Sequence, residues 1–241
     1  MAVDGSGNVV VAGTFGSGTV DFGGGPLTSA GNEDIFVAKY SSTGAHLWSK
    51  RFGGADPDHG HGVAFDGNGN VVVVGDFDGH DTGVDFGGGP LGVGVSGQCV
   101  FLAKYGPTGT HLWSKGFGAG GSVFGGEGSG HGVAVDGSDN VVVTGEFLGT
   151  VDFGGGPLTS TPGTPLGSPA VFIAKYSPTG AHLWSKGNFA LPLSVGHGYD
   201  VAANGSGNVA VVGDFEGTVD FGGGPLTSAG GQDIFVASYG P

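Results

Sequence analysis

Six of the eight histidines fall into two sets that recur along the chain. The first set comprises His61, His131 and His197, each followed by glycine shortly before an apolar, strand-like run. If these strands line a common axis, the three imidazoles converge at one mouth of a channel. Neutral imidazole binds Zn²⁺ and Ni²⁺ well, so this set predicts an axial metal site. The alternative is that the imidazoles only form hydrogen bonds with water and backbone there.

The second set lies two residues before the three tryptophans of the chain. It places His46 before Trp48, His111 before Trp113 and His182 before Trp184. Strand alternation predicts that each histidine shares a face with its tryptophan. Such pairs either pack between neighbouring sheets or form a carbohydrate site, in which the indole stacks on a sugar ring. A site of this kind would recur in each repeat, as in a multivalent lectin.

Four aspartates stand directly before glycine-rich loops, in the recurring heptad Val-Asp-Phe-Gly-Gly-Gly-Pro. They are Asp21, Asp85, Asp152 and Asp220. A carboxylate and exposed loop carbonyls could bind Ca²⁺, although one carboxylate per loop is few and the ligand spacing is not that of an EF-hand. The alternative is that the aspartate caps backbone N–H groups while the glycines adopt unusual backbone angles.

The repeats contain no Ser-His-Asp order, no paired carboxylates and no Cys-His arrangement of the kind that enzymes use. Cys99 is the only cysteine, so no internal disulfide can form. The sequence therefore predicts no enzymatic activity. Apart from the hypotheses of Zn²⁺, Ni²⁺ or Ca²⁺ above, it predicts no cofactor.

A repeated unit must position all these residues. The heptad occurs four times, with spacings of 64, 67 and 68 residues. A turn of the Asp/Asn-Gly type and a valine-rich run precede each copy, and a run such as Ile-Phe-Val-Ala-Lys-Tyr follows it. Three copies continue into His-Leu-Trp-Ser-Lys, and the fourth does not. The turns begin at Asp4, Asp66, Asp136 and Asn204.

The order of apolar runs and turns in each unit predicts four antiparallel strands. Consecutive apolar positions within the runs indicate that both faces of each sheet are buried. Glycine or proline interrupts nearly every longer stretch, so we expect no α-helix. The sequence thus predicts an all-β protein, a single β-propeller domain of four blades whose last blade lacks its outer strand. The expected blades are residues 2–54, 61–118, 131–188 and 197–241.

The lysines of the third strands are expected to form ion pairs within the blades. These lysines are Lys39, Lys104 and Lys175, and the expected partners near the ends of the second strands are Asp76, Glu146 and Asp214. The pairing is not uniform, because the first copy has Thr14 in place of an acidic residue.

The units resemble the bacterial SBBP-type β-propeller repeat. Gly62–Gly75, Phe101–Tyr105 and Trp113–Gly118 carry the resemblance in the second copy, and equivalent stretches extend it over nearly the whole chain. The unit here is longer, because the heptad is inserted between the second and third strands. The chain also has four copies where seven blades are implied. The resemblance implies a secreted or cell-surface bacterial protein, often a module of a larger one, with no family-wide activity.

The chain is glycine-rich and acidic, with 58 glycines and a formal net charge of −14. This charge repels nucleic acid phosphates and anionic membrane surfaces, so nucleic acid is excluded as a partner. No apolar run approaches the roughly 20 residues that a membrane helix needs, and we expect no membrane insertion. The N-terminus shows no leader, so the expected extracellular or cell-surface location rests on the resemblance.

Two arrangements of the blades are compatible with this pattern. Either four blades close into a ring within one chain, which we favour because four-bladed propellers exist, or the ends pair with another copy in a larger ring. The incomplete fourth blade exposes a strand edge, which predicts self-association or a protein partner there. The sequence predicts a non-catalytic binding or structural scaffold module, with a multivalent lectin as the second hypothesis and an axial metal site as the third.

Overall fold

The computed structural model describes residues 1–79, 83–92, 97–118, 127–160, 168–187, 189–190 and 194–241. Within these ranges the regular secondary structure consists entirely of β-strands, which confirms the predicted all-β class. The described residues contain no helix that could span a membrane. The strands form four main sheets, each built from one repeat, and neighbouring strands in each sheet are antiparallel.

Three of the main sheets have four strands and the last has three, as the repeats predict. The first consists of β1 (Ala2–Val3), β2 (Val9–Gly16), β5 (Glu33–Tyr40) and β6 (His46–Phe52). The second consists of β7 (His59–Phe65), β8 (Val71–Asp78), β11 (Gln98–Tyr105) and β12 (His111–Phe117). The third consists of β13 (Glu127–Val135), β14 (Val141–Leu148), β17 (Ala170–Tyr176) and β18 (His182–Gly187). The fourth consists of β20 (Val195–Ala203), β21 (Val209–Glu216) and β24 (Asp233–Tyr239).

The inserted heptad of each repeat forms a small hairpin beside its main sheet. The hairpins are β3 (Thr19–Asp21) with β4 (Pro26–Thr28), β9 (Val84–Asp85) with β10 (Pro90–Leu91), β15 (Thr150–Asp152) with β16 (Pro157–Thr159), and β22 (Thr218–Asp220) with β23 (Pro225–Thr227). The short strand β19 (Phe189–Ala190) pairs with β22. The insertion thus adds a two-stranded hairpin to each propeller-like blade.

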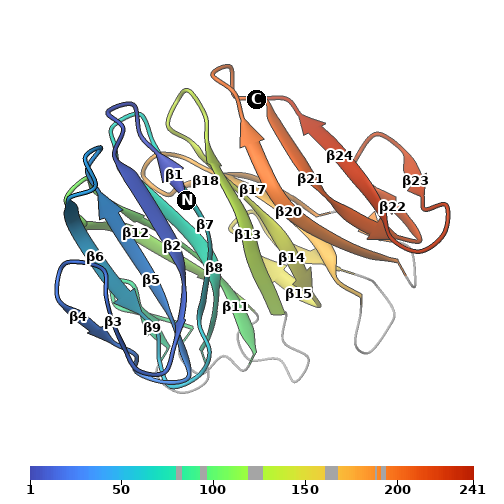
Figure 1. Ribbon diagram of the computed structural model, residues 1–241. Helices are drawn as coiled ribbons and strands as arrows, with labels where there is room; N and C mark the ends of the chain where they lie inside the picture. Colours follow the sequence, from blue (N-terminus) through green and yellow to red (C-terminus); the bar gives the residue numbers. More distant parts are fainter. Residues whose placement is uncertain (80–82, 93–96, 119–126, 161–167, 188, 191–193) are drawn as a thin grey trace.

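The main sheets stack face to face in chain order, from the blue first sheet to the red fourth sheet in Figure 1. The first strand of each sheet lies against the preceding sheet: β7 contacts β2, β13 contacts β8 and β11, and β20 contacts β14 and β17. Valines, isoleucines and phenylalanines from the two facing sheets fill each interface. Both faces of the inner sheets are buried, as the consecutive apolar positions predict.

The fourth sheet differs, because no described residue covers the side that faces onward. Strand register shows that Val100, Val171 and Ile234 are equivalent, since they stand opposite the acidic residues of the second strands. Val100 is 0% exposed and Val171 is 4% exposed, whereas Ile234 is 87% exposed. Val236 lies two residues further along β24, on the same face as Ile234, and it is 72% exposed. We call the surface of Ile234, Val236 and Val212 the open face.

The favoured closed ring of four blades is therefore wrong for this structure. Closure would bury the open face against the first sheet, yet both surfaces are exposed. On the first sheet, Met1 and Val3 are 80% and 59% exposed. The equivalent residues of the second sheet by register are Val63 and Phe65, of which Val63 is only 9% exposed.

Each buried lysine of the third strands pairs with a turn rather than with the predicted carboxylate. Lys104 Nζ lies 2.8 Å from Asp66 Oδ2, and Lys175 Nζ lies 3.0 Å from Asp136 Oδ2. The predicted partners were wrong because Lys104 stands opposite Val72, four residues along β8 from Asp76. In the first sheet, Lys39 instead donates to carbonyl oxygens of Gly69 and Pro107 in the second sheet.

We expect the substitution Asp66→Ala to be much more destabilising than Asp4→Ala. Both aspartates accept the same hydrogen bonds within their turns, from the residues two and four positions later. Only Asp66 also holds a buried lysine, and an unpaired buried charge costs about 3–5 kcal/mol. The free energy of unfolding, measured with denaturant, should differ between the two variants by about this amount. Equal losses would show that Lys104 does not depend on Asp66.

Candidate functional site

The first strands of the last three sheets bring the histidines together. β7 contacts β13, and β13 contacts β20. A β-bulge interrupts each strand between Gly60 and Gly62, Gly130 and Gly132, and Gly198 and Asp200. The bulged residues are His61, His131 and Tyr199. Because a bulge redirects one side chain out of the alternation, these three residues take a special position in each sheet.

This register corrects the set of histidines that the sequence grouped together. His61 and His131 are equivalent, but His197 stands opposite Asp214 in the way that His59 stands opposite Asp76. The third sheet has Ser129 at that position, opposite Glu146. The signal was in the spacing, since His59 and His197 both precede their turns by seven residues, whereas His61 and His131 precede theirs by five. Glycine after histidine was a weaker guide than distance from the turn.

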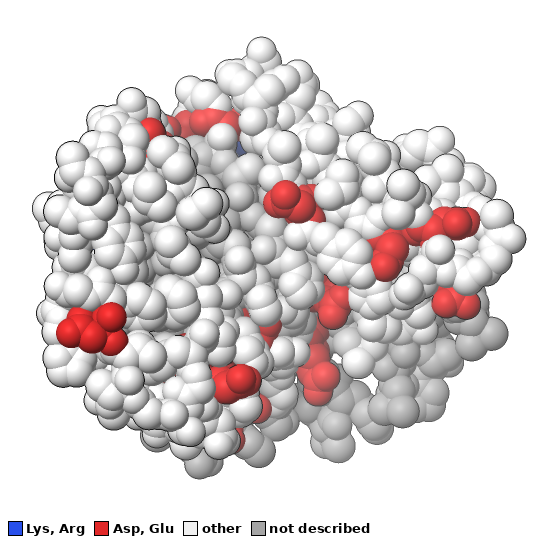
Figure 2. All heavy atoms as spheres, viewed as in Figure 1, with Lys and Arg blue, Asp and Glu red and all other residues white. Residues whose placement is uncertain are grey.

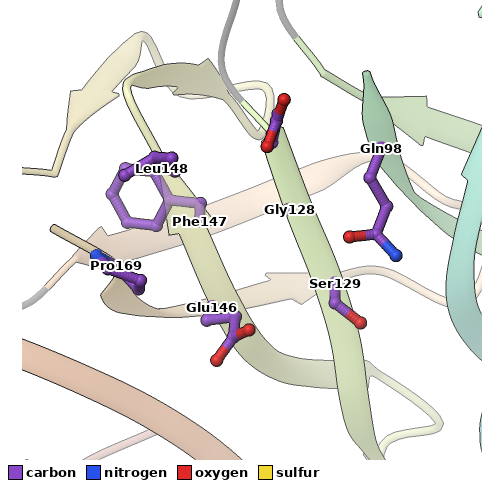
Figure 3. A pocket seen from close by; sticks show the side chains of 8 residues that line it. Gln98, Gly128, Ser129, Glu146, Phe147, Leu148 and Pro169 are labelled. Carbon is purple, nitrogen blue, oxygen red and sulfur yellow. The ribbon is translucent and has the colours of Figure 1, made fainter. Parts of the chain in front are cut away.

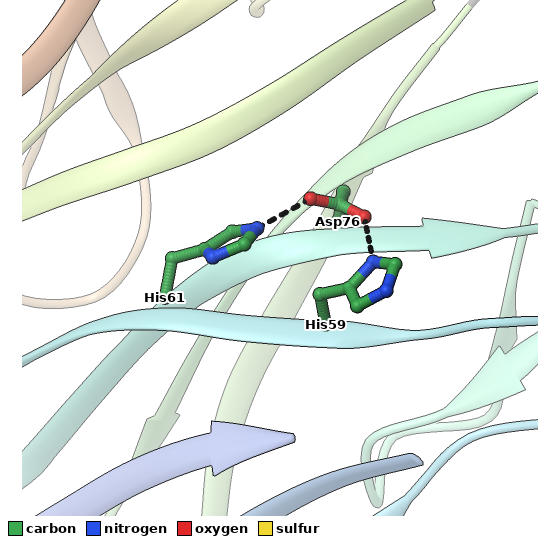
Figure 4. Close-up of side chains that lie close together, drawn as sticks. All are labelled: His59, His61 and Asp76. Atoms are coloured by element: carbon green, nitrogen blue, oxygen red, sulfur yellow. Dashed lines mark hydrogen bonds and ion pairs between the residues drawn. The ribbon is translucent and has the colours of Figure 1, made fainter. Parts of the chain in front are cut away.

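Asp76 is the centre of the best-defined cluster, shown in Figure 4. Its Oδ2 lies 2.8 Å from His59 Nδ1, and its Oδ1 lies 2.7 Å from His61 Nε2. The Ser129 hydroxyl and the Gln98 amide both donate to the same carboxylate, at 2.6 Å each. The side chain of Asp76 is 1% exposed. The sequence placed His61 in a metal site but missed His59, and it assigned Asp76 to a lysine.

Opposing effects set the protonation of this cluster. Burial alone would raise the pKa of Asp76, but hydrogen bonds from His61, Ser129 and His59 outweigh it and lower the pKa to about 2. Burial alone would lower the pKa of His59, yet Asp76 and Glu33 together raise it. Glu33 Oε2 lies 3.0 Å from His59 Nε2, so His59 has a carboxylate at each ring nitrogen.

The remaining histidines continue this line across the third and fourth sheets. The rings of His61 and His131 are 5.2 Å apart, and Glu146 Oε2 lies 4.0 Å from His131 Nε2 and 3.5 Å from His197 Nε2. Burial lowers the pKa of His131 and raises that of Glu146. The predicted axial set is thus a row, in which His61 adjoins His131 and Glu146 links His131 to His197.

Asp214 ends the row, because it binds both His197 and Tyr199. Its Oδ1 lies 2.8 Å from His197 Nδ1, and the Tyr199 hydroxyl donates to its Oδ2 at 2.6 Å. This hydrogen bond raises the pKa of Tyr199 to about 12. We call the row the histidine stripe. It comprises Glu33, His59, His61, Asp76, His131, Glu146, His197, Tyr199 and Asp214.

The histidine stripe carries an excess of negative charge. In the described part of the chain, no lysine or arginine forms an ion pair with any of its four carboxylates. The imidazoles are their only charged partners there. The face of the molecule in Figure 2 likewise shows scattered acidic side chains among uncharged atoms. The stripe is therefore suited to a cation or to protons.

A small hollow lies beside the stripe, between the second and third sheets (Figure 3). Its volume is about 120 Å³, and Gln98, Ser129 and Glu146 provide polar groups in its lining. Sites for small organic ligands usually exceed about 300 Å³. The hollow alone is therefore too small to bind a sugar.

The second set of histidines does not share a face with the tryptophans. Tyr40 pairs with His46 while Lys39 pairs with Trp48, because a β-bulge shifts the register between Lys39 and Tyr40. Successive residues of a strand point to opposite faces, so His46 and Trp48 do as well. The same bulge recurs in the second and third sheets, for His111 and His182. The predicted pairing on one face was wrong for this reason.

The histidines of this set pack beneath the glycine-rich loops of their own blades. The histidine ring lies edge-on to a tyrosine, with centroids 5.9 Å apart for His46 and Tyr40. A Cβ atom at Gly24 would overlap the His46 ring, and the same holds for His111 and His182 beneath their loops. Glycine is therefore required by close packing at this position of the loop.

Two of the tryptophans are covered by the next sheet. Trp48 Nε1 donates to the carbonyl of Pro107 at 3.0 Å, and Trp113 Nε1 donates to that of Pro178 at 3.0 Å. The turns containing these prolines lie against the indole faces. Trp184 packs against Tyr239 of the next sheet, with ring centroids 6.2 Å apart, and it also borders a hollow of about 400 Å³ that Lys186, Gly240 and Pro241 line.

The aspartates before the glycine-rich loops cap backbone groups. In each loop, one carboxylate oxygen accepts hydrogen bonds from the N–H groups two and four residues later, as Asp85 does from Gly87 and Gly89 at 2.7 and 2.9 Å. Asp21, Asp152 and Asp220 make the same contacts. The geometry is that of the capping alternative, and Ca²⁺ binding there remains a hypothesis.

Comparison with known proteins agrees with the repeat architecture. Residues 47–76, which run from β6 to β8, match the SBBP beta-propeller repeat family and confirm the resemblance found in the sequence. The chain is also 29% identical over 159 residues to the uncharacterized WD repeat-containing protein L264 of Acanthamoeba polyphaga mimivirus. That similarity covers 61% of this chain and 11% of the viral protein. Both findings favour a binding or scaffold module.

We expect the substitution Asp76→Asn to remove an acid-sensitive contribution to stability. The pKa of Asp76 is about 2 in the folded chain and 3.8 in the reference state, so the unfolded chain binds more protons between these values. The contribution is complete above about pH 4 and is lost as the pH falls towards 2. Between about pH 5 and pH 2.5, urea unfolding should show wild type losing about 2 kcal/mol more than the variant. Equal losses of unfolding free energy in wild type and variant would contradict a lowered pKa of Asp76.

Proposed function

With a β-propeller repeat as the premise, we propose that the chain is a non-catalytic scaffold module that associates with a second copy of itself. The open face carries this proposal. Ile234 and Val236 are 87% and 72% exposed, although their equivalents Val171 and Ile173 are 4% and 2% exposed. Exposed apolar surface at positions that are otherwise buried marks an interaction site.

The occupant is inferred from the interfaces inside the molecule. At each of them, the face equivalent to the open face is covered by the first strand of the following sheet, as β20 covers β14 and β17. The first sheet of another copy presents the corresponding surface, with Met1 and Val3 exposed. Each copy therefore offers both halves of one contact. Two copies joined at both ends would make eight blades, within the range of known propellers.

A lectin remains the second candidate, supported by the hollow beside Trp184. Its volume of about 400 Å³ is typical of small-molecule sites, and an indole is a suitable stacking surface for a sugar. Because proline-containing turns of the next sheet cover the indoles of Trp48 and Trp113, this candidate has one site rather than several among the described residues. A secreted or cell-surface location in a bacterium also belongs to the proposal, and it rests on the SBBP resemblance.

We expect the chain to dimerise through the open face. Light scattering over a range of concentrations should give a mass about twice the 23.5 kDa of one chain. The double variant Ile234→Asp, Val236→Asp would bury two unpaired carboxylates in the contact, and it should weaken dimerisation at least about 100-fold.

Leu183→Asp is the matched control for this experiment. Leu183 is an exposed apolar residue of β18, 48% exposed and outside the open face, so its substitution should leave the dimer intact. A wild-type chain that stays monomeric at all concentrations would refute a second copy as the occupant. A double variant that dimerises as wild type does would place the contact elsewhere.

The lectin candidate predicts that Trp184→Ala abolishes binding on a glycan array while Trp48→Ala does not. Stacking on the indole face that borders the hollow would provide most of the sugar affinity. Circular dichroism would confirm that both variants fold. If no glycan binds the wild-type chain, or if Trp184→Ala still binds, the candidate fails.

A further inference from the structure

One cluster in the histidine stripe has the donor set of a metal site. His59, His61 and Asp76 offer two imidazole nitrogens and a carboxylate oxygen that all lie within 4.8 Å of one another (Figure 4). Both histidines come from β7 and the aspartate from the neighbouring β8, so the strand pairing itself brings them together. The bulge at His61 allows two histidines of one strand to approach the same carboxylate.

The groups around these three side chains are arranged to orient them. His59 directs Nδ1 towards Asp76, and its Nε2 lies 3.0 Å from Glu33 Oε2. A metal-binding imidazole usually donates its second N–H to a carboxylate or carbonyl in this way. Asp76 is fixed in turn by Ser129 and Gln98, each at 2.6 Å. Such outer contacts set the tautomer and position of the ligands before a metal binds.

Charge is the second argument for a cation. The side chain of Asp76 is 1% exposed, and no lysine or arginine pairs with it or with Glu33 in the described part of the chain. Buried charges are normally paired or coordinated to a metal. A divalent ion between Asp76 and the two imidazoles would neutralise a carboxylate whose only charged partners among the described residues are those imidazoles.

The cluster is also accessible. The side chains of His59 and His61 are 28% and 34% exposed, so an ion can reach them from solvent. Three protein ligands and a position open to water are a common coordination for zinc. Two nitrogen donors and one oxygen donor suit Zn²⁺ better than Ca²⁺ or Mg²⁺, which prefer oxygen.

We propose that His59, His61 and Asp76 bind one Zn²⁺ ion, with Glu33 orienting His59. Among the described residues the combination occurs once, because the corresponding residues are Ser129, His131 and Glu146 in the third sheet and His197, Tyr199 and Asp214 in the fourth. The site differs from the axial set of His61, His131 and His197. It lies within one blade and does not require ring closure.

The test is zinc binding by the full chain after treatment with a chelator. Calorimetric titration with ZnCl₂, together with metal analysis, should give one Zn²⁺ per chain. Co²⁺ should bind the same site and produce visible absorption bands typical of low coordination. Zn²⁺ should also raise the melting temperature of the wild-type chain, because binding to the folded state stabilises it.

Variants of the ligands and of the orienting carboxylate separate their roles. His59→Gln and His61→Gln should each weaken Zn²⁺ binding at least about 100-fold, whereas Glu33→Gln should weaken it about 10-fold, since outer contacts contribute less. The side chains of Glu33, His59 and His61 are partly exposed, so all three variants should fold. Circular dichroism would check that they do. Zn²⁺ should no longer raise the melting temperature of His61→Gln.

The double variant His131→Gln, His197→Gln is the matched control. It removes two imidazoles of the same stripe but none of the proposed ligands, so its zinc affinity should remain within a few-fold of wild type. Loss of binding in this variant would favour the axial set and overturn the proposal. Absence of stoichiometric binding to the wild-type chain, or unchanged affinity in His59→Gln and His61→Gln, would also overturn it.

Discussion

The structure depends on apolar packing between successive sheets. Each sheet presents valine, isoleucine and phenylalanine on both faces, so none can bury its core alone. Val100 and Leu102 are fully buried only because the third sheet lies over them. Burial of this kind contributes roughly 25 cal/mol for each Å² of apolar surface. An isolated two-stranded hairpin buries too little apolar surface to be stable in water. The histidine stripe and the open face both follow from this stacking.

Two β-bulges in each complete repeat direct the side chains that are not part of the core. The bulge in the first strand separates His61 and His131 from the alternation and aligns them along neighbouring sheets. The bulge in the fourth strand sends His46 beneath its own glycine-rich loop and Trp48 towards the next sheet. The same sequence thus serves contact within a blade and contact between blades.

The strands, their order and the incomplete last sheet could be predicted because apolar runs and turn residues are local signals. The candidate site was less predictable. Strand alternation fails at a bulge, so the shared face of His46 and Trp48 was wrong. His197 was grouped with His61, although its spacing from the following turn matches that of His59. Asp76 is conspicuous only when β7 and β8 are paired in register.

Ring closure and ion pairing could not be derived from local patterns for a different reason. Closure depends on the angle between successive sheets. Small differences in packing change this angle, and the changes add up along the array. The partner of Lys104 depends on which end of the sheet its side chain reaches, and the turn at Asp66 lies at that end. Both are properties of the assembled sheets rather than of any one segment.

The near-equivalence of the interfaces has a consequence for how such a chain can change in length. Since every sheet meets its successor through the same kind of surface, removal or duplication of a whole repeat by recombination would leave each remaining junction intact. A single polar substitution inside a junction has no such compensation, because the next repeat does not alter to match it. The architecture therefore tolerates gain or loss of entire units more readily than a change at one buried position.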